Sequence, residues 1–399
     1  METDIRNNPG LLKLELYCKG MRLDPSCDLA NDAAPILRIR GGLGSGLELI
    51  LPHRLFTNVP VVEKFAQESP YILKKIDGRY YIYCDNEQVA PVELLKEPKF
   101  YKKRTSSGKL MERIGVMQGT YLGIYPTELC HFWKMGKNCK FCSVGLNLGE
   151  TEEVEKSVAD VVETVREARK ELGITFVHFN TGYMEGKEID SLMPYITAVK
   201  EKTGLLIGVQ TSPVPDLKIY DYLKKIGVDH LSFCIELYNP ERFKEVCPGK
   251  FEHLGQQKYL ETIEYTSRLF GKGKVSGEII AGLEPPEDSI KAIEHFGKVA
   301  AFATVCIFRP TVGTGLENYP PPKPTDMIPV FRRMYEVCLE NNIPIGIAPK
   351  IRVSLVILPF EGIYFLEDKK RWLGKLALMN VMKGLYRTYF YTKLAFQGR

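Results

Sequence analysis

The chain has 399 residues, with 54 basic and 49 acidic side chains and a formal net charge of +5 at pH 7. This weak excess argues against a dedicated nucleic-acid-binding protein, which usually presents a strongly basic face. No apolar run follows a basic N-terminal start, and no apolar stretch reaches a membrane-spanning length, so the sequence predicts neither a signal peptide nor a transmembrane helix.

The cysteines indicate both a compartment and a type of chemistry. Ten cysteines without a predicted secretion signal favour the reducing cytoplasm, where clustered thiols bind metals more often than they form disulfides. Cys130, Cys139 and Cys142 share one short segment, and the other seven are scattered. We therefore expect a cytoplasmic protein with a metal centre at residues 130–142.

Residues 1–112 are predicted to form a small, mostly β accessory module. The turn signal "GGLGSG" joins two apolar runs, "PILRIRGG" and "LELILP". A β-hairpin is predicted in "YILKKIDGRYYIYC", because two aromatic or β-branched runs enclose Asp77-Gly78, a favoured two-residue turn. The basic segment "KFYKKRTSSGK" then predicts a linker or an exposed loop.

From about Thr120, strand and helix patterns alternate. The strand patterns occupy residues 119–125, 174–180, 205–210, 230–237, 274–283 and 303–310. The helix patterns occupy residues 151–172, 188–204, 216–227, 256–271, 286–300 and 325–342. In the first helix, Thr151 is the expected cap. Two further strand patterns follow, at residues 343–348 and 352–359.

This alternation defines the predicted fold class. Six β/α units in succession favour a parallel sheet with right-handed crossovers. We predict an α/β protein in which residues 113–350 form a full or partial TIM-type (β/α) barrel, with a doubly wound open sheet as the alternative. Residues 351–399 are predicted to form a C-terminal extension.

The cysteine segment follows the first strand of this series, which is the face where such barrels hold their active sites. Three thiolates can bind three irons of a [4Fe–4S] cluster and leave the fourth iron open. Zinc is the alternative, because Cys139 and Cys142 form a knuckle that Cys130 and His131 would complete. Cys130 and His131 are adjacent, so binding of one ion by both would require an unfavourable backbone conformation. This requirement weakens the zinc hypothesis.

The segment "CHFWKMGKNCKFC" resembles the cluster motif of the radical SAM superfamily, and later segments resemble those of its biotin-synthase-like barrels. The likeness is a cysteine triplet that ends Cys-x-aromatic-Cys, here with Phe141, directly after the first strand. The first gap is eight residues, where the family usually has three. The resemblance implies that the open iron binds S-adenosylmethionine (SAM), which is cleaved reductively to a 5′-deoxyadenosyl radical. It also implies an electron donor such as flavodoxin or ferredoxin, and Phe141 beside the adenine.

Later segments resemble the family's cofactor-binding loops, in the expected order. "NTGYMEG" follows the second strand, and the resemblance assigns Thr181, Gly182 and Glu185 to the amino-group side of SAM. "FCIELYNPERFKEVCPGK" follows the fourth strand, where Glu236 would contact the ribose or the sulfonium side. "GEIIAGLEPPEDSIKAI" follows the fifth strand, where Gly282 would lie near the adenine. A last segment, "FRPTVGTGLENYPPP", begins at the end of the sixth strand, and with it the resemblance to the family extends over roughly residues 115–350.

Other residues are candidates for further roles. Arg309, at the end of the sixth strand pattern, either binds a carboxylate or faces solvent. Four scattered cysteines raise the question of an auxiliary iron–sulfur cluster, although cysteine is also a common core residue. They are Cys234, Cys247, Cys306 and Cys338.

The tail "KKRWLGKLALMNVMKGLYRTYFYTKLAFQGR" contains eight basic and no acidic residues, and is rich in leucine, methionine and aromatic residues. A basic amphipathic helix is expected here. It either closes the open end of the barrel with its apolar stripe, which we favour, or makes a peripheral contact with an anionic membrane.

These patterns lead to one functional hypothesis and two alternatives. The leading hypothesis is a radical SAM enzyme that abstracts hydrogen from a small-molecule substrate, in cofactor or metabolite biosynthesis. The alternatives are a zinc-stabilised β/α-barrel enzyme and a non-enzymatic metal-binding interaction protein. The weak net charge predicts no nucleic-acid partner.

Overall fold

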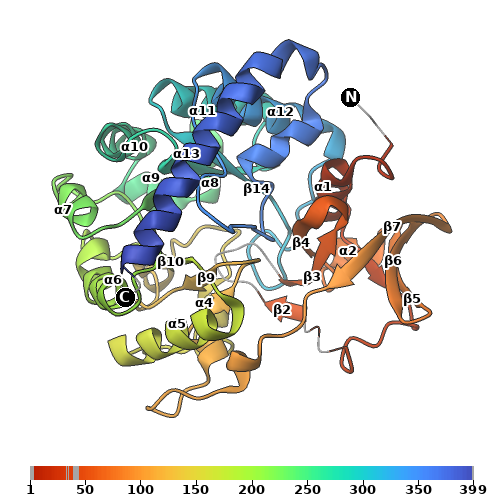
Figure 1. Ribbon diagram of the computed structural model, residues 1–399, viewed down its shortest axis with the longest axis horizontal. Coiled ribbons are helices and arrows are strands. Elements are labelled where there is room, and N and C mark those ends of the chain that lie inside the picture. Colours follow the sequence, from red (N-terminus) through yellow and green to blue (C-terminus); the bar gives the residue numbers. More distant parts are fainter. Residues whose placement is uncertain (1–3, 33, 35, 39–44, 398–399) are drawn as a thin grey trace.

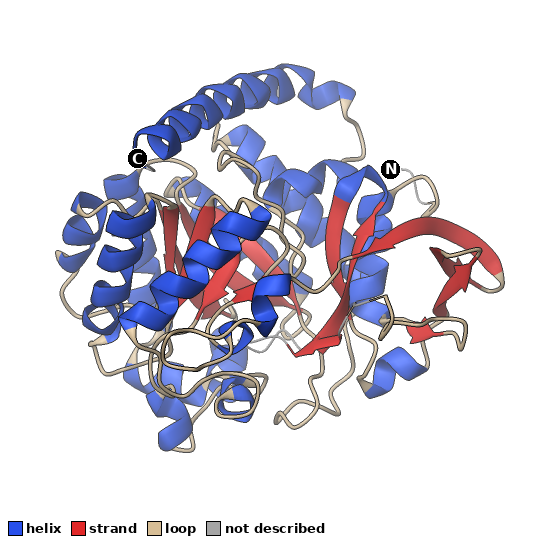
Figure 2. Cartoon of the chain, turned by 60° about the horizontal axis from the view of Figure 1, so that its bottom comes forward, coloured by secondary structure: helices blue, strands red, loops and turns tan. Residues whose placement is uncertain are grey.

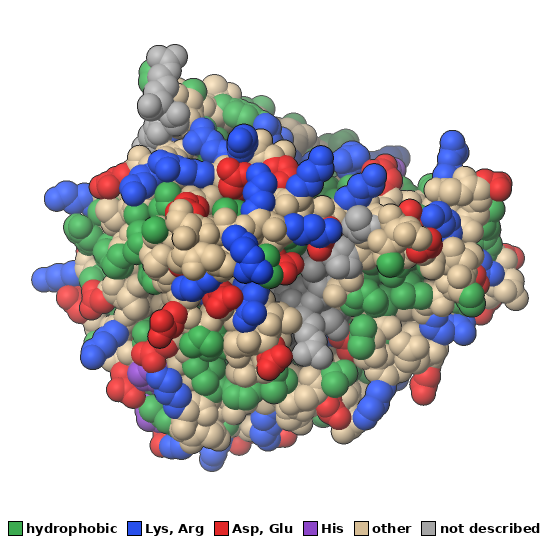
Figure 3. Space-filling model, turned by 90° about the horizontal axis from the view of Figure 1, so that it is seen from below, with side chains coloured by type: hydrophobic (Ala, Val, Ile, Leu, Met, Phe, Trp, Pro, Cys, Tyr) green, Lys and Arg blue, Asp and Glu red, His purple; other side chains and the backbone are tan. Residues whose placement is uncertain are grey.

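Two seven-stranded sheets lie beside each other and organise the chain (Figure 1). The computed structural model describes residues 4–32, 34, 36–38 and 45–397. The N-terminal part of the chain forms the first sheet, and the later strands form the second. The turn expected at "GGLGSG" lies largely outside the described residues. On the face seen in Figure 3, basic and acidic side chains are interspersed, in keeping with the small net charge.

The second sheet keeps its strands in chain order from one edge to the other. They are β8 (Val116–Met117), β9 (Leu122–Ile124), β10 (Phe176–Asn180), β11 (Leu206–Gln210), β12 (His230–Glu236), β13 (Val275–Ala281) and β14 (Phe302–Ile307). From β9 to β14 all neighbours are parallel. Progression in one direction is typical of a TIM-type barrel, whereas a doubly wound sheet reverses. Among the described strands β14 and β9 do not pair, so the predicted partial barrel is confirmed.

Helices connect these strands and pack against the sheet (Figure 2). The long ones are α5 (Val158–Leu172), α6 (Glu188–Thr203), α10 (Gln256–Phe270), α11 (Pro286–Lys298) and α12 (Pro324–Glu340). The short ones are α3 (His131–Lys134), α4 (Val144–Asn147), α7 (Ile219–Lys225), α8 (Pro240–Val246) and α9 (Pro248–His253). The apolar residues of the strands and of the inner helix faces form one main core.

The first barrel helix, α5, begins later than the sequence predicts. Thr151 is exposed and does not cap it. Instead, Ser157 Oγ accepts a hydrogen bond from the Asp160 N–H, and Asp160 Oδ2 accepts one from the Ser157 N–H, both at 3.0 Å. This capping box satisfies two helix-terminal donors at once, which explains why the helix begins at Val158.

The strands predicted at residues 343–348 and 352–359 do not form. Among the described residues, only an isolated bridge between Val305 and Ile357 joins this segment to the sheet. Its carbonyl groups bind other partners: the Ser354 oxygen accepts from the Asn58 N–H at 2.7 Å, and the Arg352 oxygen accepts from the Thr120 N–H at 3.0 Å. Because these backbone carbonyl groups accept hydrogen bonds from other segments, residues 343–359 cross the open side of the sheet without adding a strand to it.

The first sheet has mixed neighbours and is joined to a helix that the sequence analysis missed. Its strands are β1 (Arg22–Leu23), β2 (Ile36–Arg38), β3 (Ser45–Leu51), β4 (Leu55–Val59), β5 (Tyr71–Ile76), β6 (Arg79–Cys84) and β7 (Glu87–Leu94). The predicted hairpin is β5–β6, with Asp77 and Gly78 both at positive φ, as its two-residue turn requires. The missed helix is α1 (Pro9–Lys19), capped by Asn8; a one-turn helix, α2, spans Lys64–Gln67.

The C-terminal helix α13 (Leu373–Gln397) runs along the outside of the molecule (Figure 2). Its buried Phe390 packs in one cluster with Leu206, the first residue of β11, and with Phe176, the first residue of β10. The helix thus covers the end of the barrel at which the strands begin, as the sequence analysis favoured. No helix in the described part of the chain is both long and apolar enough to cross a membrane.

A buried ion pair links α1 to the rest of the molecule and generates a stability prediction. Lys13 Nζ lies 2.8 Å from Glu361 Oε2, and both side chains are inaccessible to solvent. Lys13→Met leaves a buried carboxylate without its partner, at a cost of about 3–5 kcal/mol. Arg268→Met removes one side of the exposed Arg268–Glu264 pair and costs at most about 0.5 kcal/mol. Urea denaturation of both variants measures these costs. Equal denaturation midpoints for the two variants would contradict the stabilising role of the Lys13–Glu361 pair.

Candidate active site

The three clustered cysteines lie on the long loop that leaves the carboxyl end of β9. Cys130 directly precedes α3, and Cys139 and Cys142 precede α4. The thiols of Cys130 and Cys139 interact electrostatically, and the Cys142 thiol interacts with both. The loop thus brings the three thiols within electrostatic range of one another despite its eight-residue first gap.

Backbone N–H groups point at these sulfurs. The Tyr183 N–H donates to Cys130 Sγ at 3.4 Å, and the Val144 N–H donates to the Cys142 sulfur. Such donors stabilise a thiolate more than a thiol. Burial nevertheless raises the pKa of Cys142 to about 12, so the thiolate also needs a nearby cation. Three cysteines on one loop, two of which accept backbone N–H groups, fit an iron–sulfur cluster, which binds cysteine as thiolate.

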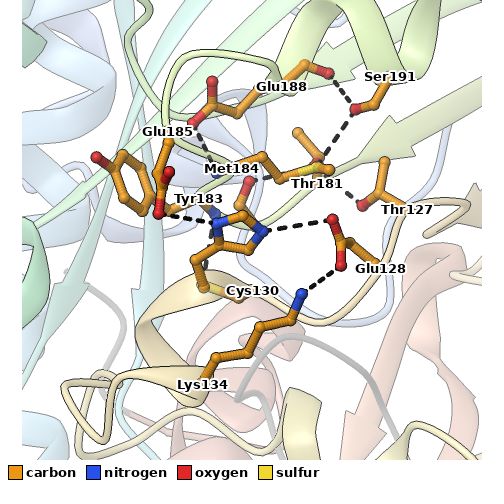
Figure 4. Close-up of polar contacts among 12 residues, drawn as sticks. Thr127, Glu128, Cys130, Lys134, Thr181, Tyr183, Met184, Glu185, Glu188 and Ser191 are labelled. Atoms are coloured by element: carbon orange, nitrogen blue, oxygen red, sulfur yellow. Dashed lines mark hydrogen bonds and ion pairs between the residues drawn. The ribbon is translucent and has the colours of Figure 1, made fainter.

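The loop after β10 packs directly on Cys130 (Figure 4). A Cβ atom placed on Gly182 would lie 2.4 Å from the Cβ of Cys130, so only glycine fits there. The Gly182 N–H donates to the Tyr125 hydroxyl at 3.2 Å, and the hydroxyl oxygens of Thr181 and Thr127 lie 3.0 Å apart. The segment expected to hold SAM is therefore adjacent to the cysteine loop.

His131 has partners other than the thiols. Its Nδ1 lies 3.3 Å from Glu185 Oε1, and its Nε2 lies 3.4 Å from Glu128 Oε1, while the other oxygen of Glu128 pairs with Lys134. Figure 4 shows Glu128 and Lys134 beside the Cys130 loop. Because both ring nitrogens face carboxylates, the arrangement does not favour the Cys₃His zinc site. Within the described residues, no group of three or more His, Cys, Asp or Glu side chains is arranged around a single metal ion.

Glu236 ends β12 in a conformation that non-glycine residues rarely adopt, with φ of 71°. The register of β12 shifts between Cys234 and Glu236, and Lys250 Nζ lies 2.6 Å from Glu236 Oε1. Burial alone would lower the Lys250 pKa, but Glu236 and neighbouring groups raise it well above its ordinary value. Backbone strain of this kind costs about 1–3 kcal/mol and concentrates at functional sites. The ion pair also interacts electrostatically with Cys139, which places it beside the cysteine loop.

A cavity of about 270 Å³ occupies the inner side of the second sheet. Its polar end is lined by Gln210, Cys234, Glu236, Glu278, Thr304 and Cys306. The carboxylate of Glu278 accepts hydrogen bonds from Gln210 Nε2 and from Cys234 Sγ, the latter at 3.2 Å. Burial raises the pKa of Glu278 to about 7, so this carboxyl group changes charge near neutral pH.

The opposite end of the cavity is apolar and aromatic. It is lined by Tyr121, Phe176, Phe302, Phe360 and Phe390. His178 and His230 also line it, and burial lowers their pKa values to about 3 and about 4, so both rings are neutral. Buried His178 Nε2 and Asn180 Oδ1 have no hydrogen-bond partner among the described residues, so both atoms can bind a ligand.

The remaining candidates are Phe141, Gly282 and Arg309. Phe141 is buried in the main core. Gly282 follows β13 at φ 101°, where an added Cβ would lie 2.7 Å from Pro322. Arg309 does not face solvent, and its guanidinium interacts electrostatically with the Glu63 carboxylate. It is fully buried, with Nη1 3.2 Å from Asn58 Oδ1 and its guanidinium over the Tyr17 ring, because the first sheet covers it.

The four other cysteines do not converge. Cys234 and Cys306 line the cavity, and Cys338 lies in a separate cluster around α12. The Cys247 side chain hydrogen-bonds the Cys139 thiol, so it adds a fourth sulfur beside the cysteine loop. This placement gives the auxiliary cluster no support. Sequence reasoning missed the roles of Gln210 and Glu278, although a lone carboxylate in the apolar run "GEIIAG" was a usable signal.

Comparison with known proteins assigns the class. Residues 129–296 match the family model described as "Radical SAM superfamily". A bacteriochlorophyllide c C-7(1)-hydroxylase of Chlorobaculum limnaeum is 21% identical over 245 residues, which cover 56% of this chain and 61% of that protein. Residues 129–296 therefore resemble a radical SAM domain, and the matches support an enzyme of the radical SAM class. The family implies a [4Fe–4S] cluster and SAM.

Two solved structures are also similar. Methylornithine synthase aligns with a TM-score of 0.46 and 17% identity, over 61% of this chain and 68% of that chain. Coproporphyrinogen III oxidase of Escherichia coli aligns with a TM-score of 0.39 and 15% identity, over 55% of this chain and 52% of that chain.

The contact of Gly182 with Cys130 gives a prediction for cluster assembly. Gly182→Ala forces the loop or the thiol to shift, at a cost of about 1–3 kcal/mol. We expect less iron and sulfide per chain after anaerobic reconstitution. Gly384→Ala is the control, since no heavy atom lies within 4 Å of its added Cβ. Full iron content in the Gly182 variant would contradict the predicted role of this contact.

The raised pKa of Glu278 gives a prediction for pH dependence. A carboxyl whose pKa rises from 4.5 to about 7 on folding contributes stability below pH 4.5, and this contribution is lost as pH rises to 7. Glu278→Gln removes that loss. Between pH 4.5 and pH 8, the variant should therefore gain about 1–3 kcal/mol relative to the wild type in urea denaturation. If the free energies of unfolding of the two proteins changed with pH in the same way, burial would not raise the pKa of Glu278.

Proposed function

We propose that this enzyme holds a [4Fe–4S] cluster through Cys130, Cys139 and Cys142 and uses SAM to abstract hydrogen from a small molecule in the barrel cavity. The observation that carries the proposal is the packing of Gly182 on Cys130. It brings the expected SAM-binding loop against the expected cluster loop. Glu236 adjoins both Cys139 and the cavity, which supports a continuous path from cluster to substrate.

Each group of residues has a distinct part in this proposal. When bound, the reduced cluster supplies the electron that cleaves SAM and generates a 5′-deoxyadenosyl radical. The N–H groups of Tyr183 and Val144 orient the sulfurs of Cys130 and Cys142. Lys250 fixes Glu236 at the mouth of the cavity. The apolar walls exclude water, which would otherwise quench a radical. A protein such as reduced flavodoxin or ferredoxin supplies the electron.

The cavity favours an uncharged substrate with both apolar and hydrogen-bonding parts. Its volume of about 270 Å³ suits a small metabolite. Aromatic side chains form one end, and His178 Nε2 and Asn180 Oδ1 offer polar contacts without charge. The likeness to a bacteriochlorophyllide hydroxylase supports a biosynthetic role, although a match of 21% identity does not extend to its substrate.

Reductive cleavage tests the proposal directly. The reconstituted enzyme with dithionite and SAM should release 5′-deoxyadenosine, and Cys142→Ala should abolish the release. Cys27→Ser, in the loop between β1 and β2, is the control because this residue lies outside the proposed site, so the variant should still release 5′-deoxyadenosine. Stoichiometric zinc without cleavage would instead support a zinc-stabilised barrel, and full activity of Cys142→Ala would reject the ligand assignment.

A further inference from the structure

The outer face of α13 carries exposed large apolar side chains and no charged ones. Its exposed large side chains are Leu373, Leu378, Val381, Leu385, Tyr389, Tyr391 and Phe396. Val381, Leu385 and Phe396 are 61%, 69% and 74% exposed. Their spacing of three and four residues places most of them on one side of the helix, opposite the buried Met379 and Phe390. We call this set the outer face of α13.

The cations of α13 lie along its flanks. Lys375 Nζ donates to Asn342 Oδ1 at 2.9 Å, Arg387 Nε donates to the Gly346 oxygen at 3.1 Å, and Lys393 pairs with Asp229. All three side chains are only partly exposed. From residue 373 to residue 396, every exposed side chain is therefore uncharged, and every charged side chain is cationic and lies at the border with the protein body.

One group of these cations lacks neutralising carboxylates. Arg352 and Lys383 both lie over the Phe360 ring, at 5.7 and 5.1 Å from its centre, and Arg387 lies beside them. In the described part of the chain, none of the three forms an ion pair. Burial lowers the pKa of Lys383, and the charges of Arg387 and Arg352 lower it further. An anion placed there would relieve this repulsion.

From this arrangement we propose that α13 docks the enzyme on an anionic lipid surface. The outer face enters the boundary between headgroups and acyl chains, and the flanking cations meet the phosphates. Lys369, Lys370 and Arg371 are exposed just before the helix and add positive charge there, next to exposed Glu367 and Asp368. A second copy of this chain is a poorer occupant, because a twofold contact between outer faces brings like-charged flanks together.

Vesicle co-sedimentation of the full chain tests this docking. We expect binding to vesicles of phosphatidylcholine and phosphatidylglycerol in equal parts, and little binding to phosphatidylcholine alone. Val381→Glu with Leu385→Glu should abolish binding. Lys383→Gln with Arg387→Gln should weaken it, by about fivefold per cation if each contributes about 1 kcal/mol. Tyr222→Glu is the control, because Tyr222 is an exposed apolar residue on α7, outside the outer face.

Three results would overturn the proposal. The first is wild-type protein that stays in solution with the anionic vesicles. The second is an equal loss of binding in the Tyr222 control. The third is a dimer by light scattering that Val381→Glu with Leu385→Glu dissociates, without vesicle binding, which would identify the outer face as a contact between copies. Circular dichroism of each variant confirms that α13 remains folded.

Discussion

The close approach of two loops is the constraint on which the candidate site depends. Gly182 leaves no room for a side chain against Cys130, and the neighbouring Tyr183 N–H bonds its sulfur. Both loops follow adjacent parallel strands, β9 and β10, whose carboxyl ends lie at the same edge of the sheet. The register of these strands therefore sets the position of the first thiol relative to the expected SAM loop. Packing by Cys247 and the Lys250–Glu236 pair then supports the loop from the side of β12.

The barrel interior has a polar end near the cysteine loop and an aromatic end far from it. The irregular segment at residues 343–359 covers the open side of the sheet, and α13 covers the end of the barrel at which the strands begin. This arrangement shields the reaction space without closing the barrel. Because Phe390 of α13 lines the aromatic end of the cavity, the helix that carries the outer face also forms part of the cavity wall. The proposed docking surface and the proposed substrate cavity thus share one structural element.

Periodicity was sufficient for the strands and long helices of the barrel, because each strand is buried and each helix has one apolar face. It did not identify α1, whose residues are buried nearly all round. The strands predicted after α12 do not form, because their carbonyl groups accept hydrogen bonds from the first sheet and from the segment just before β9. Such tertiary contacts are not visible in the local sequence. The cysteine triplet could be recognised from its local spacing in the sequence. The roles of Arg309, Lys250 and Glu278 could not be predicted, because their partners are distant in sequence.

The central claim is that SAM binds directly at a cluster held by the three cysteines. Electron paramagnetic resonance of the dithionite-reduced enzyme, with and without SAM, tests it most directly. We predict a signal from a reduced [4Fe–4S] cluster whose g-values change when SAM is added, and no such signal in Cys139→Ala. A cluster signal that SAM leaves unchanged would contradict the account, as would an unaltered signal in the variant.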